Sequence, residues 1–412
     1  MGETSPDRVL GRIKHLLSSR DITLNLLINI MHKTLAIKKL LKEPRGTDAL
    51  RRALSDKAVC NIFYQVSSRT HVSSSVAAAK LLGAYVFEIV GSKIDGEYQL
   101  AYSSLYEKGA SLLDELALTY GSYFDLLNIR APRVGMVEEV ARKLDDIGYN
   151  VSVINAGTGE KGEGEHPTQA VDDVYTFFGG FEIDIARDWQ KLPDYSIAFI
   201  NDGRARVVRS NALLMGKLLR MELKFISHPD LEPPRDLLDE LERDGVKFSI
   251  HHELQPASAA YVLRVPEDWI GKEKTEEIRK SGMHFSLTRF VADKFGYQGV
   301  MHPFPRSEKG NELPSYEAVG DESLDTDLYR AWYKKQILNG PPVRAAVMLT
   351  LLDPTLDILT LKQQTLDASF TGQCGHCGRL YSSVAGWGAL KVERYRRLPL
   401  LPLCRWCLEE KK

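Results

Sequence analysis

The sequence predicts an α/β protein with two doubly wound parallel-sheet lobes and a small cysteine-rich domain at the C-terminal end. Two successive series of short apolar segments alternate with segments of helical periodicity, which is the pattern of parallel sheets covered by helices. Four of the five cysteines lie in the last 39 residues. At roughly 150 residues per domain, the chain of 412 residues is long enough for two to three domains.

The composition is that of a folded protein without a strong electrostatic field. Hydrophobic residues make up 43% of the chain and charged residues 26%, and 54 basic residues face 55 acidic ones. Such a balance does not by itself recruit nucleic acid or an anionic membrane. The longest apolar stretches, such as residues 345–352, fall well short of the roughly 20 residues of a membrane-spanning helix. With no apolar signal core at the N-terminus, we expect a soluble, cytoplasmic protein.

The first lobe is expected to begin with helices and to continue with four strands. Residues 1–56 carry apolar side chains at helical spacing. The predicted strands are residues 59–64, 85–90, 125–129 and 151–154, and the predicted helices between them include 76–82 and 136–147. Residues 1–165 are therefore assigned to this lobe, which helices from residues 320–356 complete.

The second lobe is expected over residues 166–319, after a hinge near 165–190. The predicted strands are residues 196–200, 223–226, 246–250, 260–263 and 299–301, and helices around 324–338 and 343–352 follow. In open parallel sheets, ligands bind where the carboxyl ends of the strands lead into helices. The loops at those ends are therefore the candidate sites.

Four of these loops carry polar side chains. Ser67, Ser68, Arg69 and Thr70 lie between a strand and a helix start, where N–H groups, hydroxyls and a guanidinium can bind a phosphate. This segment alone is also compatible with a capped helix start and an exposed arginine. The other loops are His166-Pro167-Thr168-Gln169, Asp202-Gly203-Arg204-Ala205-Arg206 and His302-Pro303-Phe304-Pro305-Arg306. Their shared place at strand ends favours a common site.

Roughly residues 15–352 resemble the aspartate/ornithine carbamoyltransferase family. The Ser-Thr-Arg-Thr loop of the family is similar to residues 67–70, and its His-Pro-x-Gln motif to residues 166–169. Its His-Pro-Leu-Pro-Arg motif is similar to residues 302–306, with Phe304 in place of leucine. The mobile loop that carries a serine and a lysine into the neighbouring subunit's site resembles residues 104–109. The arginine that ends the third strand of the first lobe matches Arg130.

The resemblance implies transfer of a carbamoyl group from carbamoyl phosphate to an amine, with no covalent nucleophile and no organic cofactor. Orientation of the reactants and stabilisation of the oxyanion of a tetrahedral intermediate are then the main sources of catalysis. By resemblance, the catalytic residues are Arg69, Thr70, Lys108, Arg130 and His166. The implied substrate-binding residues are Ser67, Ser68, Ser104, Gln169, Arg206, Arg264, Phe304 and Pro305, with Gln169 at the carbamoyl amide.

Two arginines favour L-aspartate as the acceptor. Arg206 and Arg264 match family arginines that bind the carboxylates of aspartate, whereas the Asp-x-x-Ser-Met-Gly and His-Cys-Leu-Pro segments of ornithine enzymes are absent. The implied products are N-carbamoyl-L-aspartate and phosphate, a step of pyrimidine biosynthesis. However, Gln65 and Pro266 replace a glutamate and a glutamine of the family. A carbamoyltransferase for another amine, or a weakly active paralogue that serves as a regulatory or scaffold subunit, therefore stays open.

The cysteine tail predicts a zinc ribbon over residues 367–412. Cys374 and Cys377 are separated by 26 residues from Cys404 and Cys407, a spacing typical of two knuckles that close one tetrahedral site. Four thiolates leave no open coordination position, so the zinc is expected to be structural; the alternative is four unligated thiols. The net charge of +5 from Cys374 onward is a modest surplus for nucleic-acid binding. We expect the ribbon to stabilise a homotrimer or higher oligomer, with a regulatory chain as a candidate partner.

Overall fold

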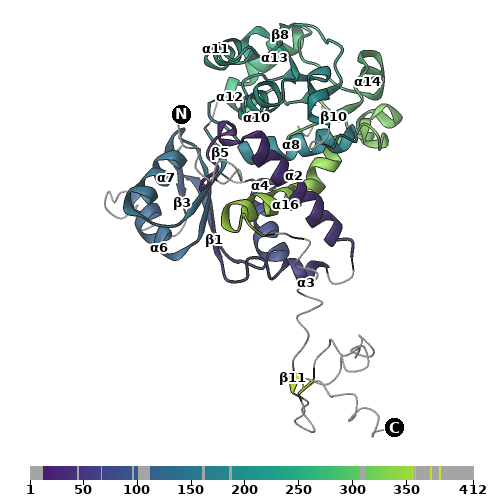
Figure 1. Cartoon of the computed structure of the whole chain (residues 1–412). Helices are drawn as coiled ribbons and strands as arrows, with labels where there is room; N and C mark the ends of the chain where they lie inside the picture. The colour runs from purple at the N-terminus through teal and green to yellow at the C-terminus, as the bar shows by residue number, and fades with distance from the viewer. Residues whose placement is uncertain are drawn as a thin grey trace, which may run out of the picture.

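The computed structural model describes residues 13–43, 46–65, 67–94, 97–100, 112–159, 163–184, 188–306, 312–356 and 358, and the backbone of two short strands, β11 (Gly372–Gln373) and β12 (Leu380–Tyr381). Figure 1 shows two lobes side by side, one coloured mainly blue and the other mainly teal and green. Each lobe is built on its own five-stranded sheet. The prediction of two separate, largely parallel sheets is therefore confirmed.

The sheet of the first lobe has the strand order β3-β2-β1-β4-β5. Its strands are β1 (Ala58–Phe63), β2 (Tyr85–Ile94), β3 (Glu97–Leu100), β4 (Leu126–Ala131) and β5 (Ser152–Thr158). Four of them pair in parallel, and β3 pairs antiparallel with β2. Strands β1, β4 and β5 are buried almost throughout, as expected for a sheet covered on both faces. The sequence pattern misses β3, because its four residues form no apolar run.

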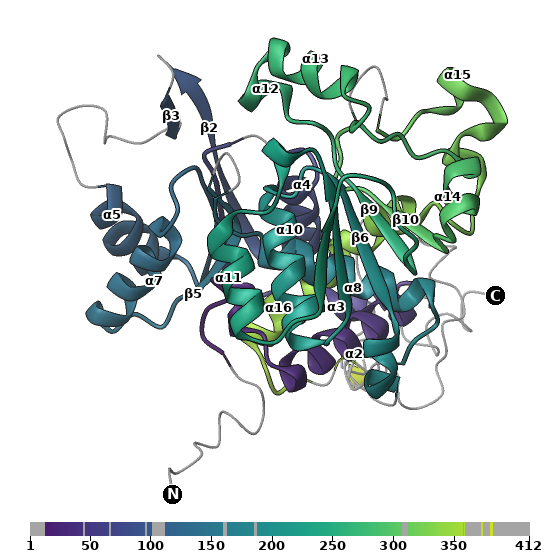
Figure 2. The same ribbon diagram turned by 90° about the horizontal axis from the view of Figure 1, so that it is seen from above.

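The sheet of the second lobe has the strand order β10-β9-β6-β7-β8 and is parallel throughout. Its strands are β6 (Ser196–Asn201), β7 (Glu222–Ser227), β8 (Phe248–His251), β9 (Ala259–Val262) and β10 (Gly299–Met301). All five strands are predicted by the sequence to within two residues at their ends. In the view of Figure 2 these strands lie next to each other, with α10 and α11 beside them.

Helices surround both sheets. Those of the first lobe are α2 (Leu24–Leu40), α3 (Gly46–Leu50), α4 (Thr70–Ser75) with a π-helical continuation (Val76–Leu81), α5 (Leu112–Asp114), a π-helical segment (Glu115–Tyr120), α6 (Gly121–Tyr123) and α7 (Met136–Ile147). Those of the second lobe are α10 (Arg206–Asn211) with a π-helical continuation (Ala212–Leu218), α11 (Arg235–Arg243), α12 (Glu267–Ile270), α13 (Lys272–Lys280), α14 (Arg289–Phe295) and α15 (Tyr316–Val319). Helices α8 (Pro167–Gly180) and α16 (Trp332–Leu352) connect the lobes. Single 3₁₀ turns are Ser19–Asp21, Pro229–Leu231, Gly320–Glu322 and Leu324–Thr326, and a longer one is Trp189–Asp194.

The helical expectation for the N-terminal region is wrong over its first described residues. Leu16 is fully buried and forms a parallel bridge with Ile154 of β5, so the chain here extends the edge of the first sheet. Helix α2 begins only after Thr23, whose side chain accepts a hydrogen bond from the Leu26 N–H. Because a short apolar cluster fits a strand edge as well as a helix face, periodicity alone does not separate the two.

The two predicted C-terminal helices are also corrected, because a single helix replaces them. Helix α16 runs from Trp332 to Leu352 and passes through Pro341 and Pro342, where helices usually end. It packs against both α2 and α8, and most of its residues are buried. Contacts with these neighbouring helices therefore offset the backbone hydrogen bonds that the prolines cannot make.

The junction between the lobes is an apolar core centred on α8 and α16. Phe177 and Phe181 lie edge-on to the Trp332 ring, with ring centroids 6.0 and 4.9 Å away. Gly180 and Gly299 lie directly against the same ring, where an added Cβ would come within 2.3 and 2.0 Å of it. The core extends from α2 to the second sheet without a break. Both lobes are therefore packed on the same pair of helices.

None of the helices in the described ranges combines the length and the apolar character that crossing a membrane requires. The cytoplasmic location expected from the sequence stays a prediction.

Candidate active site

Four strand ends bring the predicted loops to the junction between the lobes. Thr70 begins α4 after β1, and His166 precedes Pro167 at the first position of α8. Arg206 begins α10 after β6, and His302 follows β10. These are the helix starts and strand ends that the sequence predicts for the four motifs. Contacts between the loops then decide which of the side chains share a site.

The loop after β1 meets the start of α8 through a buried hydrogen bond. Thr70 Oγ1 lies 3.0 Å from His166 Nε2, and both residues are 4% exposed. The Thr70 N–H donates to Ser67 Oγ at 3.2 Å, which orders the loop around the helix start. Ser68 is exposed in the same loop. The structure therefore brings Thr70 and His166 together, with Ser67 as a support.

Arg69 connects this loop to the one after β10. Its Nη1 donates to the carbonyl oxygen of His302 at 3.3 Å and to that of Pro303. Its guanidinium also lies over the Phe304 ring, 5.6 Å from the centroid. The Phe304 N–H donates to His302 Nδ1 at 2.9 Å, and Phe304 is joined to Pro305 by a cis peptide bond. One arginine thus contacts a loop of the opposite lobe.

Arg130 and His166 both lie against Gly157 near the end of β5. A Cβ added to Gly157 would lie 3.3 Å from both Arg130 Nη1 and His166 Cδ2, which is a tight contact, and the φ of +117° at this position favours glycine. Burial lowers the pKa of His166 well below its usual value, and the charges of Arg130, Arg344, Arg206 and Arg69 lower it further. The imidazole is therefore neutral at pH 7 and acts as a hydrogen-bonding group rather than a cation.

Arg206 extends from the second lobe to the first. Its Nη1 donates to the carbonyl oxygens of Gly159 and Thr158, at 2.9 and 3.4 Å, and its Nη2 donates to Gln65 Oε1 at 3.4 Å. Gln65 is thus beside this arginine, although it replaces the glutamate of the family. A neutral amide holds the guanidinium by hydrogen bonding alone.

Arg264 lies at the other predicted acceptor position, in contact with its own lobe. Its Nη2 donates to both carboxylate oxygens of Asp268, at 2.8 and 3.0 Å, and its side chain is 42% exposed. Nearby, burial raises the pKa of Asp202 to about 6, while the charges of Arg204 and Arg264 act in the opposite direction. Arg206 thus contacts the first lobe and Arg264 contacts Asp268, and the binding of an acceptor by this pair stays a prediction.

Gln169 is buried in the first turn of α8 and donates to Asp173 Oδ1 at 2.7 Å. Asp173 and Asp202 are not among the site residues that the sequence predicts. Asp202 belongs to a strand-end loop, which is a usable signal. Asp173 lies within a helix, and an acidic residue there usually indicates a solvated face.

Six predicted residues fall outside the described part of the chain. They are Ser104 and Lys108 of the mobile loop and the four cysteines Cys374, Cys377, Cys404 and Cys407. Their roles stay predictions.

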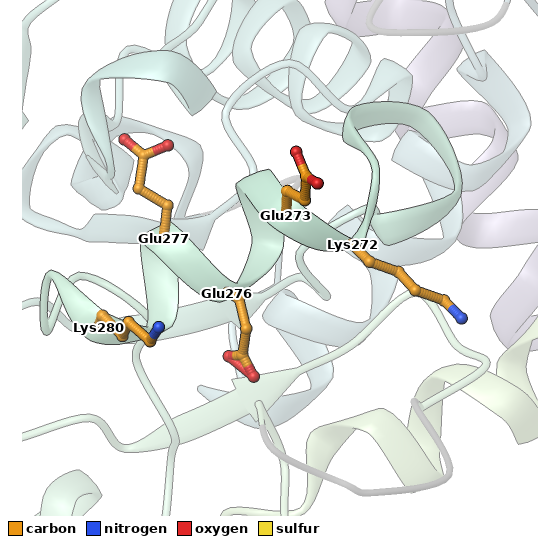
Figure 3. Close-up of a pocket in the computed structure, with 5 residues that line it drawn as sticks. All are labelled: Lys272, Glu273, Glu276, Glu277 and Lys280. Atoms are coloured by element: carbon orange, nitrogen blue, oxygen red, sulfur yellow. The ribbon is translucent and has the colours of Figure 1, made fainter.

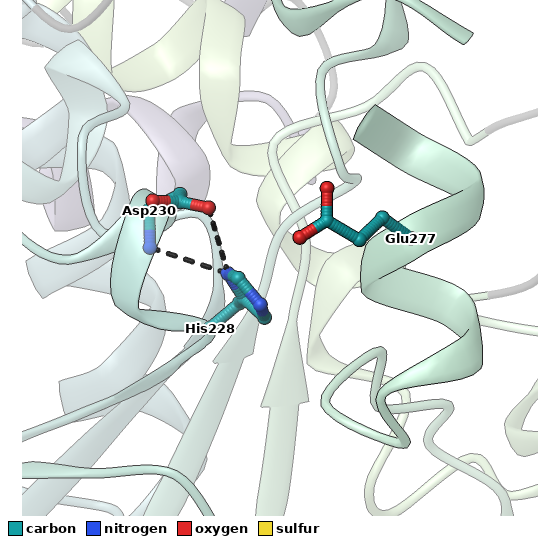
Figure 4. A group of neighbouring side chains, drawn as sticks. All are labelled: His228, Asp230 and Glu277. Atoms are coloured by element: carbon teal, nitrogen blue, oxygen red, sulfur yellow. Dashed lines mark hydrogen bonds and ion pairs between the residues drawn. The ribbon is translucent and has the colours of Figure 1, made fainter. Parts of the chain in front are cut away.

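Two surface features of the second lobe lie apart from the strand-end loops. Figure 3 shows a shallow hollow along the exposed, charged face of α13, lined by Lys272, Glu273, Glu276, Glu277 and Lys280. Figure 4 shows His228, Asp230 and Glu277 close together. Lys274 pairs with both of these carboxylates, with its Nζ 2.9 Å from Glu277 Oε1. The carboxylates already have a cationic partner, and we assign no metal to the group.

Known proteins match most of this chain. A model of the carbamoyl-phosphate-binding domain of aspartate/ornithine carbamoyltransferases matches residues 14–178, and a model of their aspartate/ornithine-binding domain matches residues 193–351. The aspartate carbamoyltransferase catalytic subunit of Methanocaldococcus jannaschii is 28% identical over 83% of this chain and 98% of its own. That of Cellvibrio japonicus is 31% identical over 73% of this chain and 82% of its own.

Solved structures agree with these matches. The catalytic subunit of M. jannaschii aspartate transcarbamoylase has a TM-score of 0.64 at 26% identity, over 83% of this chain and 99% of that one. Trypanosoma cruzi aspartate transcarbamoylase in complex with N-(phosphonacetyl)-L-aspartic acid has a TM-score of 0.65 at 24% identity, over 83% of this chain and 96% of that one, and shares the fold. This chain belongs to the aspartate/ornithine carbamoyltransferase family.

Proposed function

We propose that this protein transfers the carbamoyl group of carbamoyl phosphate to the amino group of L-aspartate, giving N-carbamoyl-L-aspartate and phosphate. The observation that carries the proposal is the meeting of three strand-end loops around Thr70, His166 and Arg69. The relatives that match over most of this chain are aspartate carbamoyltransferase catalytic subunits, which supports aspartate as the acceptor.

The phosphate of the donor substrate would bind at the start of α4. Ser67, Ser68 and Thr70 offer hydroxyl groups there, and the free N–H groups of a helix start favour an anion. Arg69 supplies a guanidinium, whose positive charge complements the phosphate group of carbamoyl phosphate. The same charge stabilises the phosphate as it leaves. Lys108 and Ser104, by resemblance, would complete the phosphate site from a neighbouring subunit.

The carbonyl oxygen of the carbamoyl group requires donors where negative charge develops. Thr70, Arg130 and His166 are the donors that the resemblance implies, and all three lie at the meeting point of β5, α4 and α8. A neutral His166 contributes an N–H, while the positive charge comes from Arg130. In other enzymes, one such donor is worth about 100- to 1000-fold in kcat. The departing phosphate can accept the proton of the amine, so no separate base is required.

The acceptor would bind between Arg206 and Arg264. The two carboxylates of aspartate need two cationic partners, and these arginines lie in the second lobe at the ends of β6 and β9. Gln65 offers Arg206 a neutral amide oxygen where the family has a carboxylate.

The test is an assay of N-carbamoyl product with aspartate, ornithine and a panel of other primary amines at saturating carbamoyl phosphate. We expect aspartate to give the highest kcat/KM. A higher value for another amine would reassign the acceptor. No product with any amine would favour a regulatory or scaffold subunit.

We also propose a homotrimer or higher oligomer, in which the loop containing Ser104 and Lys108 completes the site of a neighbour. The family resemblance of this loop supports the proposal. A regulatory chain is a candidate partner, since the relatives are named as catalytic subunits.

The C-terminal segment is proposed to bind one structural zinc ion through Cys374, Cys377, Cys404 and Cys407. The support is the paired spacing of the cysteines. The zinc would order a ribbon that packs on a catalytic subunit and stabilises the oligomer.

A further inference from the structure

Asp173 is a fully buried carboxylate that accepts hydrogen bonds from three elements of the fold. Its Oδ1 accepts from Gln169 Nε2 of α8 and from Gln336 Nε2 of α16, both at 2.7 Å. Its Oδ2 accepts from Asn211 Nδ2 at the end of α10, also at 2.7 Å. Asp173 and its three partners are at most 4% exposed. In such surroundings the direction of each hydrogen bond is set by chemistry, because a buried donor without an acceptor is costly.

Burial raises the pKa of Asp173, while the hydrogen bonds from Asn211, Gln169 and Gln336 favour its ionised form. Both carboxylate oxygens accept from amide N–H groups, so this carboxylate fixes which end of each neighbouring amide faces it. The amide nitrogen of Gln169 must point to Asp173, and its Oε1 must point away. Among the described residues, that Oε1 has no hydrogen-bond partner and is not sealed from solvent. The amide group that Gln169 leaves available to a ligand is therefore an acceptor and not a donor.

The same carboxylate also orders the opposite wall of the site. With its nitrogen held by Asp173, Gln336 turns its Oε1 to the His302 N–H, which donates to it at 2.9 Å. His302 and Pro303 in turn supply the carbonyl oxygens that accept from Arg69. A single buried carboxyl group thus sets the orientation of Gln169 on one side and of the loop after β10 on the other.

We propose that Asp173 is a positioning residue that holds the Gln169 amide oxygen toward the NH₂ of the carbamoyl group and so gives the site its preference for carbamoyl phosphate over acyl phosphates that lack an NH₂. The proposal rests on the proposed function, which places carbamoyl phosphate beside Gln169. The amide oxygen accepts from an NH₂ but gains nothing from a methyl group. Were the Gln169 amide reversed, its own NH₂ would face that of the substrate.

The experiment compares carbamoyl phosphate with acetyl phosphate, which has a methyl group in place of the NH₂. The measured quantity is the preference, taken as the inhibition constant of acetyl phosphate divided by the KM of carbamoyl phosphate. Asp173→Leu keeps the branched shape, with two methyl groups in place of the two oxygens, but offers no acceptor, so Gln169 can rotate. We expect the preference to fall about tenfold, the loss of one hydrogen bond, mainly through carbamoyl phosphate.

Asp172 provides a matched control on the same helix. It is also buried, at 1% exposed, but it accepts no hydrogen bond from a described residue, and its ion-pair partner Arg344 is 4.0 Å away. Asp172→Leu removes an adjacent buried acid without touching Gln169. We expect this variant to keep the wild-type preference, whatever its effect on stability.

A rescue variant separates positioning from mere support of the fold. In Asp173→Asn/Asn211→Asp the carboxylate moves to the other end of one hydrogen bond, and net charge is conserved. The amide oxygen introduced at position 173 can still accept from Gln169 and Gln336, while the amide nitrogen beside it donates to the new acid at position 211. We expect the preference to return to within about threefold of wild type.

Each outcome decides the proposal. A wild-type preference in folded Asp173→Leu, an equal loss for both acyl phosphates, or a lost preference in the folded exchange variant would overturn it. If Asp173→Leu does not fold, Asp173→Glu replaces it, since it keeps a carboxylate but displaces it by one methylene; an unchanged preference there overturns the proposal too. A wild-type protein that makes no carbamoyl product refutes the proposed function instead, which keeps the two failures distinct.

Discussion

Arg69 shows how much one side chain does at this site. Its guanidinium contacts the carbonyl oxygens of His302 and Pro303 and the ring of Phe304, so a side chain of the loop after β1 also links the lobes. These contacts hold the charge in one place before substrate binds. Preorganised charge costs no rearrangement when the substrate arrives.

We therefore predict that Arg69→Ala raises the KM of carbamoyl phosphate roughly 10- to 100-fold, the range for losing hydrogen bonds to a charged group. Steady-state kinetics with varied carbamoyl phosphate measures it. Arg69→Lys is the control: it keeps the charge but lacks the planar fork, so it should recover only part of the affinity. An alanine variant with wild-type KM would remove Arg69 from the phosphate site.

Arg264 should affect the binding of the acceptor substrate. Arg264→Ala is expected to raise the KM of the acceptor roughly 10- to 100-fold while the KM of carbamoyl phosphate stays within about twofold. Asp268→Asn is the matched variant, because it frees Arg264 from an exposed pair worth only about 0.3–0.5 kcal/mol. It should lower the acceptor's KM by no more than about twofold. An unchanged acceptor KM in Arg264→Ala would show that this arginine does not bind the acceptor.

The motif residues could be found from the sequence because they lie at strand ends, where polar side chains beside apolar runs are conspicuous. Thr70, His166 and Arg69 are examples, and the structure brings their loops together. Asp173 and Gln336 could not be found in this way. Each is a polar residue inside a helix, and only the packing of α8 against α16 turns them toward one another.

At the scale of elements, strand prediction succeeds where apolar runs are bounded by turns and fails where neighbouring elements decide. β6 and β9 are such runs, and both are found. The edge segment at Leu16 and the uninterrupted α16 depend on partners that are remote in the sequence. Helix α8 is a further case, because its adjacent acids Asp172 and Asp173 are both buried.

This burial predicts a pH dependence of stability. Burial raises the pKa of Asp172 from 3.8 to about 7, although Arg344, Arg69 and Lys38 favour its ionised form; Asp173 disfavours it. Between pH 4 and 7 the native state holds a proton that the unfolded state has released, so the free energy of unfolding falls as pH rises. Above pH 7 Asp172 is ionised in the native state as well, and the free energy of unfolding is then lower by about 4 kcal/mol, the equivalent of roughly three pKa units.

Asp172→Asn cannot ionise and should escape this penalty. We expect its stability to equal that of wild type near pH 4 and to exceed it by a few kcal/mol at pH 8, measured as the difference in free energy of unfolding in urea. A variant less stable than wild type at pH 8 would show instead that attraction to Arg344 outweighs the cost of burying the carboxylate.

At the scale of the whole molecule, the lobes are joined by charge as well as by the shared core. Arg20, in the 3₁₀ turn before α2, pairs with Glu240 of α11 in the second lobe and with Glu165 just before α8. Its guanidinium is partly exposed, so salt screens these pairs and they favour an arrangement of the lobes without locking it. The site lies at this junction, and its geometry therefore depends on how the lobes are held.

The cysteine tail is expected to depend on zinc for its fold and to stabilise the oligomer. A segment of about 45 residues has little core of its own, so a zinc ion held by four thiolates would supply much of its folding energy. We expect about one zinc per chain by metal analysis of the purified protein. Cys404→Ser/Cys407→Ser should abolish that zinc, lower the temperature of thermal unfolding and shift the protein toward smaller species in analytical ultracentrifugation. Removing zinc from wild type with a chelator should reproduce these changes.

Cys60→Ala provides the control for cysteine replacement, because Cys60 is buried in β1, far along the chain from the tail. Burial raises the pKa of its thiol to about 12, so it offers no thiolate to a metal at pH 7. The zinc content of the Cys60→Ala variant should match that of wild type, even if the loss of side-chain volume lowers the free energy of unfolding. A tail variant that loses zinc but keeps its oligomeric state and thermal stability would assign the ribbon a role other than assembly. A wild-type protein without zinc would refute the proposal that the tail forms a zinc ribbon.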